Sequence, residues 1–163
     1  MTANAHDFAQ AIVARLAHGR QLETVKLQKL LYFIQGWSLA VWGKPAFDQP
    51  IEAWRYGPVV PSVYERHANQ AYVDADFDFG GDSKRLNNID HSIVEYVLAN
   101  YGGTAAFKLA DYTHMHGSPW HEATYPDGSQ RAVYYADISQ ESMRSYFMKE
   151  AERIRLGGDF VPK

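Results

Sequence analysis

Apolar residues recur every three or four positions through most of the chain, which is the spacing of one face of an α-helix. The first such stretch carries Phe8, Ile12 and Leu16, and Asn4 stands before it as a candidate N-cap. The second runs from about residue 24 to 42 and is the most apolar segment of the chain. We therefore expect this second helix at the centre of the molecule.

The second half of the chain repeats the helical spacing. One stripe consists of five apolar or aromatic residues, Ile89, Ile93, Tyr96, Val97 and Tyr101. Thr104 is a candidate cap for a short helix after it, and Ser118-Pro119 is a typical helix start. Asp137 with Gln140 resembles a capping box before the last helix.

Prolines and a glycine between residues 48 and 61 exclude a helix there, and we call this stretch the proline-rich corner. A short strand near 50–56 fits the corner, and Pro61 suits the first turn of a third helix. Residues 72–79 alternate weakly and could pair with that strand, or they could form a loop. The acidic stretch 74–90 is expected to be a surface loop.

Together these elements predict a mainly α fold, a compact single-domain bundle of about six to seven helices with a small β element. The 163 residues are enough for one domain, so we expect residues 1–163 to form a single unit. A composition of 46% hydrophobic and 21% charged residues is typical of a globular protein. No stretch has the pattern of a signal peptide or a membrane span.

Charge and cysteine content exclude several functions. The net charge of −3 provides no overall basic field, which disfavours a dedicated nucleic-acid binder. The chain has no cysteine, so disulfides and thiolate chemistry are excluded, and we expect a reducing, cytoplasmic location. Within residues 15–35, however, four basic residues outnumber one acidic residue, namely Arg15, Arg20, Lys26 and Lys29 against Glu23. This stretch predicts a basic patch on the second helix.

Three histidines within eight residues, His114, His116 and His121, would be enough for a catalytic zinc ion. His114 and His116 are two residues apart, so on a helix they would point to different faces. The spacing of the three histidines also matches no zinc-hydrolase motif. If a metal bound, His114 with Asp111 or Glu122 would be the first candidates. The chain has no nucleophile elbow and no phosphate-binding loop, so we expect no catalytic residue, metal or cofactor. A metal-dependent hydrolase is the weakest alternative.

Aromatic residues gather on or beside the second helix and the proline-rich corner. They are Trp37, Trp42, Trp54, Tyr56, Tyr64 and Trp120. Such residues dominate both protein cores and the hot spots of protein interfaces. The residues alone therefore favour a helical interaction domain.

An ordered set of short motifs covers nearly the whole chain. They are the run from Lys26 to Tyr32, Gln35-Gly36-Trp37, the run from Gly43 to Asp48, the run from Ile51 to Val59, Val63-Tyr64, the run from Leu109 to His114, Pro119-Trp120, and Asp137-Ile138-Ser139 through Tyr146-Phe147. In this order they resemble the Panacea domain, the SocA-like family that includes phage-associated GepA-type proteins. Ala46 and His116 depart mildly from the family pattern.

This resemblance implies a non-enzymatic antitoxin of a toxin–antitoxin system, which neutralises a cognate protein toxin by direct binding. The resemblance does not identify the toxin class. Antitoxins of this family are paired with unrelated toxins, and toxic small alarmone synthetases are among them. The alternative that the family offers is a proteolytic adaptor, which delivers a bound toxin to a Clp-type protease. Neither a membrane nor a nucleic-acid partner is expected.

The basic patch and the rigid corner predict the residues that face the toxin. These are Lys26, Lys29, Tyr32, Trp54, Arg55 and Tyr56, although Tyr32 and Trp54 could equally belong to the core. The other motif residues are expected to be structural, and they are Leu27, Leu30, Gly36, Trp37, Ala53, Gly57, Pro58, Tyr64, Thr113, His114 and Trp120.

Overall fold

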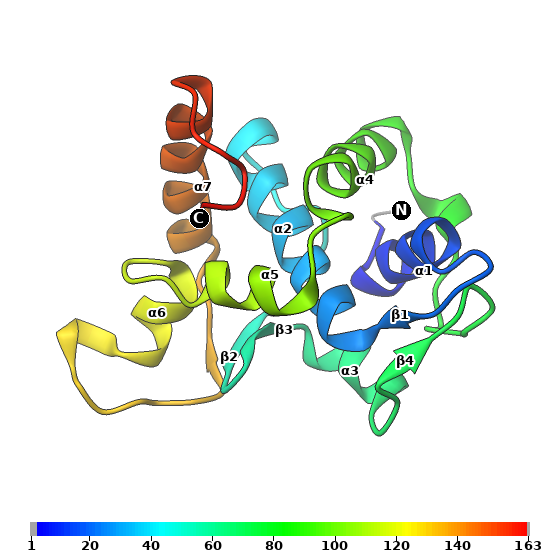
Figure 1. Ribbon diagram of the computed structural model, residues 1–163, viewed down its shortest axis with the longest axis horizontal. Helices are drawn as coiled ribbons and strands as arrows, with labels where there is room; N and C mark the ends of the chain where they lie inside the picture. Colours follow the sequence, from blue (N-terminus) through cyan, green and yellow to red (C-terminus); the bar gives the residue numbers. More distant parts are fainter. Residues whose placement is uncertain (1–2, 163) are drawn as a thin grey trace.

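The computed structural model describes residues 3–162, in which six α-helices are arranged around a seventh, central one (Figure 1). The helices are α1 (Ala5–Leu16), α2 (Thr24–Trp42), α3 (Pro61–His67), α4 (Asn88–Tyr101), α5 (Ala106–Thr113), α6 (Pro119–Thr124) and α7 (Gln140–Arg155). Two 3₁₀ turns, η1 (Ser83–Arg85) and η2 (Pro126–Gly128), lie in the connections. The predicted helical class and the number of helices are confirmed.

Helix α2 is the centre of the molecule. It runs between α7 on one side and α4 and α1 on the other, and α5 crosses near its first turns (Figure 1). Because neighbours cover its middle part, residues 27–39, on all sides, even Lys29 and Phe33 are buried. The central position was predicted, but a basic outer face for this helix was wrong.

Five very short strands form two small sheets. They are β1 (Leu22–Glu23), β2 (Glu52–Trp54), β3 (Gly57–Val59), β4 (Tyr72–Val73) and β5 (Ala136–Asp137). All pairings are antiparallel: β1 with β4, and β2 with both β3 and β5.

The strand predicted near 50–56 is half of a hairpin. The chain turns after β2 and returns as β3, which begins at Gly57 with a φ of 123°, a conformation that favours glycine. The predicted pairing of residues 72–79 with this strand was wrong. Only Tyr72 and Val73 are extended, and they pair with β1, while the second partner of β2 comes from the far end of the chain. Strands of two or three residues are too short for an alternating pattern to identify their partners.

The predicted helix starts at Asn4 and Ser118 are confirmed, since both side chains accept hydrogen bonds from the first turns of α1 and α6. The caps predicted at Thr104 and Asp137 were wrong. The N-cap of α5 is Ala105, because Thr104 takes part in the turn that closes α4. Asp137 lies in β5, and the cap of α7 is Ser139, whose hydroxyl accepts from the amide of Ser142.

The acidic stretch 74–90 covers α1 (Figure 1). The Gln10 side chain donates to the carbonyl of Phe77 at 2.7 Å and accepts from the amide of Phe79 at 3.1 Å. The Phe79 side chain is fully buried, so this stretch contributes to the core as well as to the surface. Its last residues already belong to α4.

Aromatic side chains fill the core between α2, α4 and α7. Phe33 stacks on Tyr101 with ring centroids 4.2 Å apart, and the Trp37 indole donates to the Tyr101 hydroxyl at 2.9 Å. Gly36 leaves room for the Phe147 ring, which a Cβ at this position would overlap. Trp37 and Gly36 are therefore structural, as the sequence predicts.

An ionic cluster fastens α7 to α5. The Tyr112 hydroxyl donates to the buried Glu150 carboxylate, and Arg153 donates to both oxygens of that carboxylate at 3.0 Å. Burial raises the pKa of Tyr112, which keeps its hydroxyl protonated as a donor. The buried carboxylate is thus fully paired, as a buried charge requires.

Within residues 3–162, no helix combines the length and the apolar character that crossing a bilayer would require.

Candidate partner-binding surface

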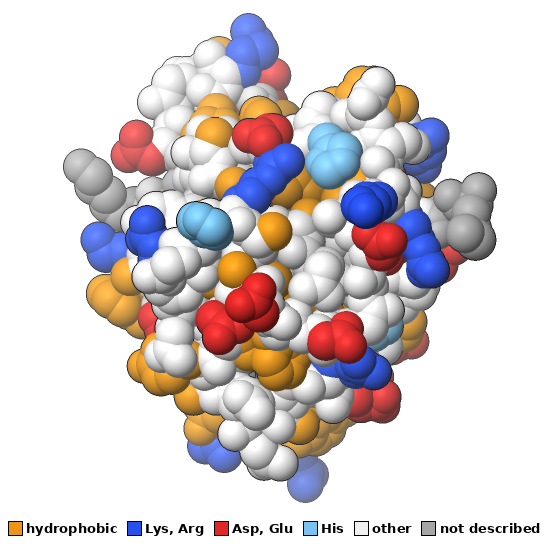
Figure 2. Space-filling model, turned by 90° about the vertical axis from the view of Figure 1, so that its right-hand side faces the viewer, with side chains coloured by type: hydrophobic (Ala, Val, Ile, Leu, Met, Phe, Trp, Pro, Cys, Tyr) orange, Lys and Arg blue, Asp and Glu red, His pale blue; other side chains and the backbone are white. Residues whose placement is uncertain are grey.

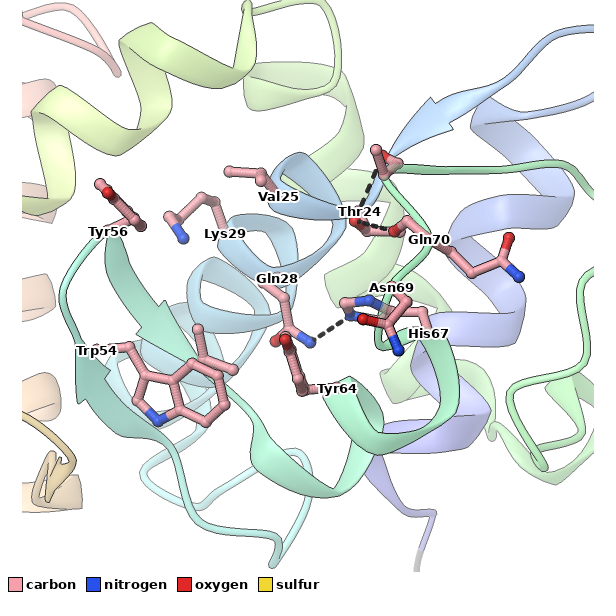
Figure 3. Close-up of a pocket in the computed structure, with 12 residues that line it drawn as sticks. Thr24, Val25, Gln28, Lys29, Trp54, Tyr56, Tyr64, His67, Asn69 and Gln70 are labelled. Atoms are coloured by element: carbon pink, nitrogen blue, oxygen red, sulfur yellow. Dashed lines mark hydrogen bonds between the residues drawn. The ribbon is translucent and has the colours of Figure 1, made fainter.

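The first turns of α2, the β2–β3 hairpin and α3 enclose a hollow of about 490 Å³ (Figure 3). We call it the α2–α3 pocket, and its walls include Gln28, Lys29, Trp54, Tyr64 and His67. All twelve lining residues come from the stretch 24–71, and they include no Asp or Glu. The volume lies in the range of ordinary ligand pockets.

Four aromatic side chains, Trp54, Tyr56, Tyr64 and Tyr135, form what we call the aromatic rim of this pocket. Tyr64 and Tyr135 both meet the Trp54 ring edge-on, with centroid distances of 4.8 and 5.5 Å. Tyr56 and Tyr135 are 73% and 66% exposed, so much of the rim faces solvent. Exposed aromatic side chains beside a concave surface are typical anchors of protein interfaces.

Two residues of this region hold an unusual backbone conformation. In the described part of the chain only three non-glycine residues have a positive φ, and two of them are Asn69 at 70° on the pocket wall and Tyr135 at 69° in the rim. For a bulky residue such as tyrosine this conformation costs roughly 1–3 kcal/mol. Such strain concentrates at functional sites, and here it aims an aromatic ring at Trp54.

Lys29 lies on the floor of the pocket and is only 2% exposed. Its Nζ donates to the carbonyl oxygen of Pro58 at 3.3 Å, and no carboxylate of the described residues lies within 4 Å. Burial lowers the pKa of Lys29 from 10.5 to about 8, which leaves it mostly charged at neutral pH. A Cβ at Gly57 would come within 2.6 Å of Lys29 Cε, and the φ of 123° at this position also favours glycine.

Gln28 braces the opposite wall. Its Oε1 accepts from the amide of Val60 at 2.8 Å, and its Nε2 donates to His67 Nε2 at 2.9 Å. Burial lowers the pKa of His67, which agrees with a neutral ring that accepts this bond. One side chain of α2 therefore holds α3 at its N-cap, Val60, and at its last residue, His67, which fixes this wall of the pocket.

The second group of motif residues supports the β2–β3 turn from behind. The Trp120 indole donates to the carbonyl of Trp54 at 2.7 Å, and His114 Nε2 lies 3.3 Å from the carbonyl of Arg55. The His114 ring also packs against Trp120, with centroids 4.0 Å apart. These residues hold the turn that carries the rim, which is a structural role.

The three neighbouring histidines do not form one cluster. Both ring nitrogens of His114 face carbonyl oxygens, those of Ala110 and Arg55, whereas His116 packs against His121 with centroids 4.6 Å apart. Among residues 3–162 no group of three His, Asp or Glu side chains is placed to share a metal ion. The grouping that the hydrolase alternative requires is absent from this part of the chain.

The six residues predicted to face the toxin do not lie together in the structure. Trp54, Arg55 and Tyr56 lie together on the β2–β3 turn, and the Arg55 guanidinium lies 5.9 Å from the centre of the Tyr56 ring. Tyr32 is 1% exposed, so its prediction as a surface residue was wrong. It packs edge-on against Phe147 in the aromatic core.

The predicted basic patch on α2 does not form. Lys29 is buried, Lys26 is half-buried with its Nζ 2.5 Å from the carbonyl of Gly102, and Arg15 pairs with Glu95. On the face that includes α1, basic and acidic side chains are interspersed (Figure 2). A local excess of charge in the sequence therefore does not become a charged surface.

Sequence reasoning missed four residues of this surface as binding candidates: Gln28, His67, Asn69 and Tyr135. A glutamine on a helix face otherwise apolar was the available signal for Gln28. Nothing in the sequence indicates that Tyr135 would lie beside Trp54, because the contact depends on the pairing of β5 with β2.

A small helical unit with a preformed, aromatic-rimmed pocket has the features of a protein-interaction domain. The family model described as "Antitoxin SocA-like, Panacea domain" matches residues 27–121, and the chain belongs to this family. The matched region runs from α2 into α6 and includes ten of the twelve residues that line the pocket, together with the residues that support its turn.

One curated relative is the protein "Antitoxin SocA" from Caulobacter vibrioides (strain NA1000 / CB15N). It is 31% identical over 109 residues, which represent 61% of this chain and 58% of the relative. The match thus spans less than two thirds of the length of that relative. No solved structure matches this chain at a significant level.

Proposed function

We propose that this protein is an antitoxin that neutralises a cognate protein toxin by direct, non-catalytic binding through the α2–α3 pocket and its aromatic rim. Membership of the SocA-like family and the similarity to an antitoxin support the function. The aromatic rim around a preformed pocket supports the choice of surface.

The rim suits tight binding because it is rigid before the partner arrives. Trp120 and His114 hold the backbone of the β2–β3 turn, and Gln28 holds α3 against α2. A surface that is already ordered loses little conformational entropy on binding, so more of the contact energy contributes to affinity. Exposed Tyr and Trp side chains add large apolar areas with few rotatable bonds.

Co-expression with the toxin, which is to be sought first in the neighbouring reading frames, tests this proposal. We expect the wild type to restore growth, and the double variant Tyr56→Ala, Tyr64→Ala to fail while retaining its thermal unfolding transition. Loss of two rim anchors should weaken toxin binding by at least about tenfold, since interface hot spots contribute roughly 2 kcal/mol or more each.

Trp42→Ala is the control, because Trp42 is 46% exposed at the far end of α2, away from the pocket. It should neutralise the toxin like the wild type. Full rescue by the rim variant would contradict the proposed surface. Measuring the toxin half-life in the same cells identifies the adaptor alternative, in which the toxin disappears faster when this protein is present.

A further inference from the structure

We propose that the α2–α3 pocket is a carboxylate-binding site, in which an Asp or Glu side chain of the protein partner pairs with Lys29 Nζ. Apolar side chains next to that carboxylate would pack on the aromatic rim. This inference rests on the proposed function, because it names the chemistry by which the partner is recognised.

The first argument is the missing counter-ion. An ammonium group has three donors, and the one hydrogen bond of Lys29 to the described residues goes to the carbonyl of Pro58. Elsewhere in the same fold a buried charge is fully paired. The Glu150 carboxylate accepts hydrogen bonds from the Tyr112 hydroxyl and from two guanidinium nitrogens of Arg153. The pocket walls offer Lys29 no carboxylate, so the pairing group has to come from outside these residues.

The second argument is the direction of the lysine. Its Nζ lies between Tyr56 and Trp54 on the side of the hollow (Figure 3). With about 490 Å³ available, the pocket can receive an acidic side chain together with part of a neighbouring residue. The same space is bounded by the rim, so charge recognition and apolar packing occur in one place.

The third argument concerns which anion fits. Lys29 is the one Lys or Arg among the lining residues, and the His67 ring already accepts a hydrogen bond from Gln28. A single positive charge in apolar surroundings matches the single negative charge of a carboxylate. Phosphoryl groups carry more charge and are typically bound by arginine clusters or several amide donors, which these walls do not supply.

The fourth argument is energetic. Desolvation usually offsets much of the attraction in a buried ion pair. Here the lysine is already desolvated in the free protein, so only the partner carboxylate loses its water on binding. The remaining attraction acts in surroundings of low dielectric, where it is stronger than at an exposed surface.

Short peptides provide a direct test with the full chain. The probe is acetyl-Leu-Glu-Leu-amide, compared with the uncharged acetyl-Leu-Gln-Leu-amide, and binding is followed by the NMR signal of the Trp54 indole. We expect the Glu peptide to bind at least about fivefold more tightly, and the difference to vanish in Lys29→Met. Lys108→Met, on the exposed face of α5, should keep the difference.

Several outcomes would overturn the inference. Equal binding of both peptides, no binding of either up to about 10 mM, or an undiminished preference in Lys29→Met would each reject a carboxylate site at Lys29. Tighter binding of acetyl-Leu-phosphoserine-Leu-amide than of the Glu peptide would assign the pocket to phosphoryl groups instead. Lys29→Met is expected to fold, because it replaces an ion by an apolar side chain of similar length.

Toxin neutralisation by the rim variant and by Lys29→Met shows separately whether this inference or the proposed function fails. If the rim variant loses neutralisation while Lys29→Met retains it, the carboxylate site is rejected and the antitoxin surface stands. If both variants neutralise fully, the surface itself is rejected. Loss in both variants, with Glu-peptide selectivity in the wild type, supports both.

Discussion

Lys29 shows how far one side chain can depart from the behaviour that its type suggests. Its position in an amphipathic pattern predicts an exposed cation, yet it lies on the floor of a pocket because the middle part of α2 is covered on every side. Hydrophobic spacing describes a helix relative to its own axis. It does not reveal that a second layer of helices and a hairpin will cover the polar side as well.

The first prediction is that Lys29 makes the stability of the protein depend on pH. Its pKa is about 8 in the folded chain and 10.5 when unfolded, so the unfolded state binds more protons between these values. The contribution of Lys29 to the free energy of unfolding should therefore rise from pH 8 to 10.5, by up to about 3 kcal/mol. Below pH 8 the lysine is charged in both states, and the cost of burying that charge is constant.

Lys29→Met should remove this rise and increase the free energy of unfolding at pH 7. Urea denaturation of both proteins at pH 7 and pH 10 measures the effect. The other groups titrate equally in both, so the difference between the two proteins isolates Lys29. A difference that is the same at both pH values would contradict the assigned pKa.

At the residue level, local signals identified two helix caps correctly and misplaced two others, Thr104 and Asp137, by one or two residues. Asn4 and Ser118 could be identified as caps because capping depends on neighbours three residues away. Tyr32 and Lys29 could not be placed correctly, since their burial depends on α7 and on the β2–β3 hairpin. Trp54 and Tyr56 were correctly placed outside a helix, because the prolines of that region exclude one. Their contact with a partner stays a prediction.

Among the elements, α7 is held in place by both apolar packing and a buried ionic cluster. Besides its apolar stripe, it carries Glu150, which joins Tyr112 of α5 to Arg153 of α7 itself. Met143 and Phe147 of that stripe are buried, and Ile154 is partly buried. The ionic cluster was not predictable, because it requires α5 and α7 to be neighbours.

We predict that Tyr112→Phe lowers the free energy of unfolding by about 1–3 kcal/mol, because the buried Glu150 loses a hydrogen bond from a hydroxyl. Urea unfolding followed by circular dichroism checks this. Tyr134→Phe is a matched control, since Tyr134 is 39% exposed, and its stability should change by less than about 0.5 kcal/mol. Equal stabilities for both variants would show that the hydroxyl of Tyr112 contributes nothing.

Helices and strands differed in how well they could be predicted. The bounds expected for α2, about 24 to 42, agree with the observed Thr24–Trp42, because many periodic residues and a left-handed Gly43 define them. The pairings of β2 and β4 could not be derived. Each involves only two or three residues, and β5 joins β2 from the other end of the chain.

At the scale of the whole molecule, basic and acidic side chains are interspersed on the face that includes α1 (Figure 2), and the candidate pocket carries Trp54, Tyr56 and Tyr64 with one Lys and no Arg (Figure 3). Salt weakens interactions between exposed charges but has little effect on apolar contacts or on buried pairs. We predict that the affinity for the toxin changes by less than about tenfold between roughly 0.05 and 0.5 M salt. Calorimetric titration at both concentrations measures it.

A loss of affinity of about a hundredfold or more over this range would instead indicate recognition by an exposed basic patch. The sequence favoured such a patch from four basic residues within 15–35. Three of these residues do not contribute to an exposed basic patch. Lys29 is buried, Lys26 donates to the carbonyl of Gly102, and Arg15 pairs with Glu95.

The pocket is built from one uninterrupted stretch, residues 24–71, while α4 to α7 and the C-terminal turn complete the body that holds it. In terms of inheritance, this arrangement keeps the candidate determinants of partner choice, with the exception of Tyr135, on a single short piece of the gene. One recombination event inside the gene can replace that piece as a cassette and leave most of the scaffold codons untouched. Descendants of one ancestral fold can then acquire new partners by exchange as well as by the slow accumulation of point mutations.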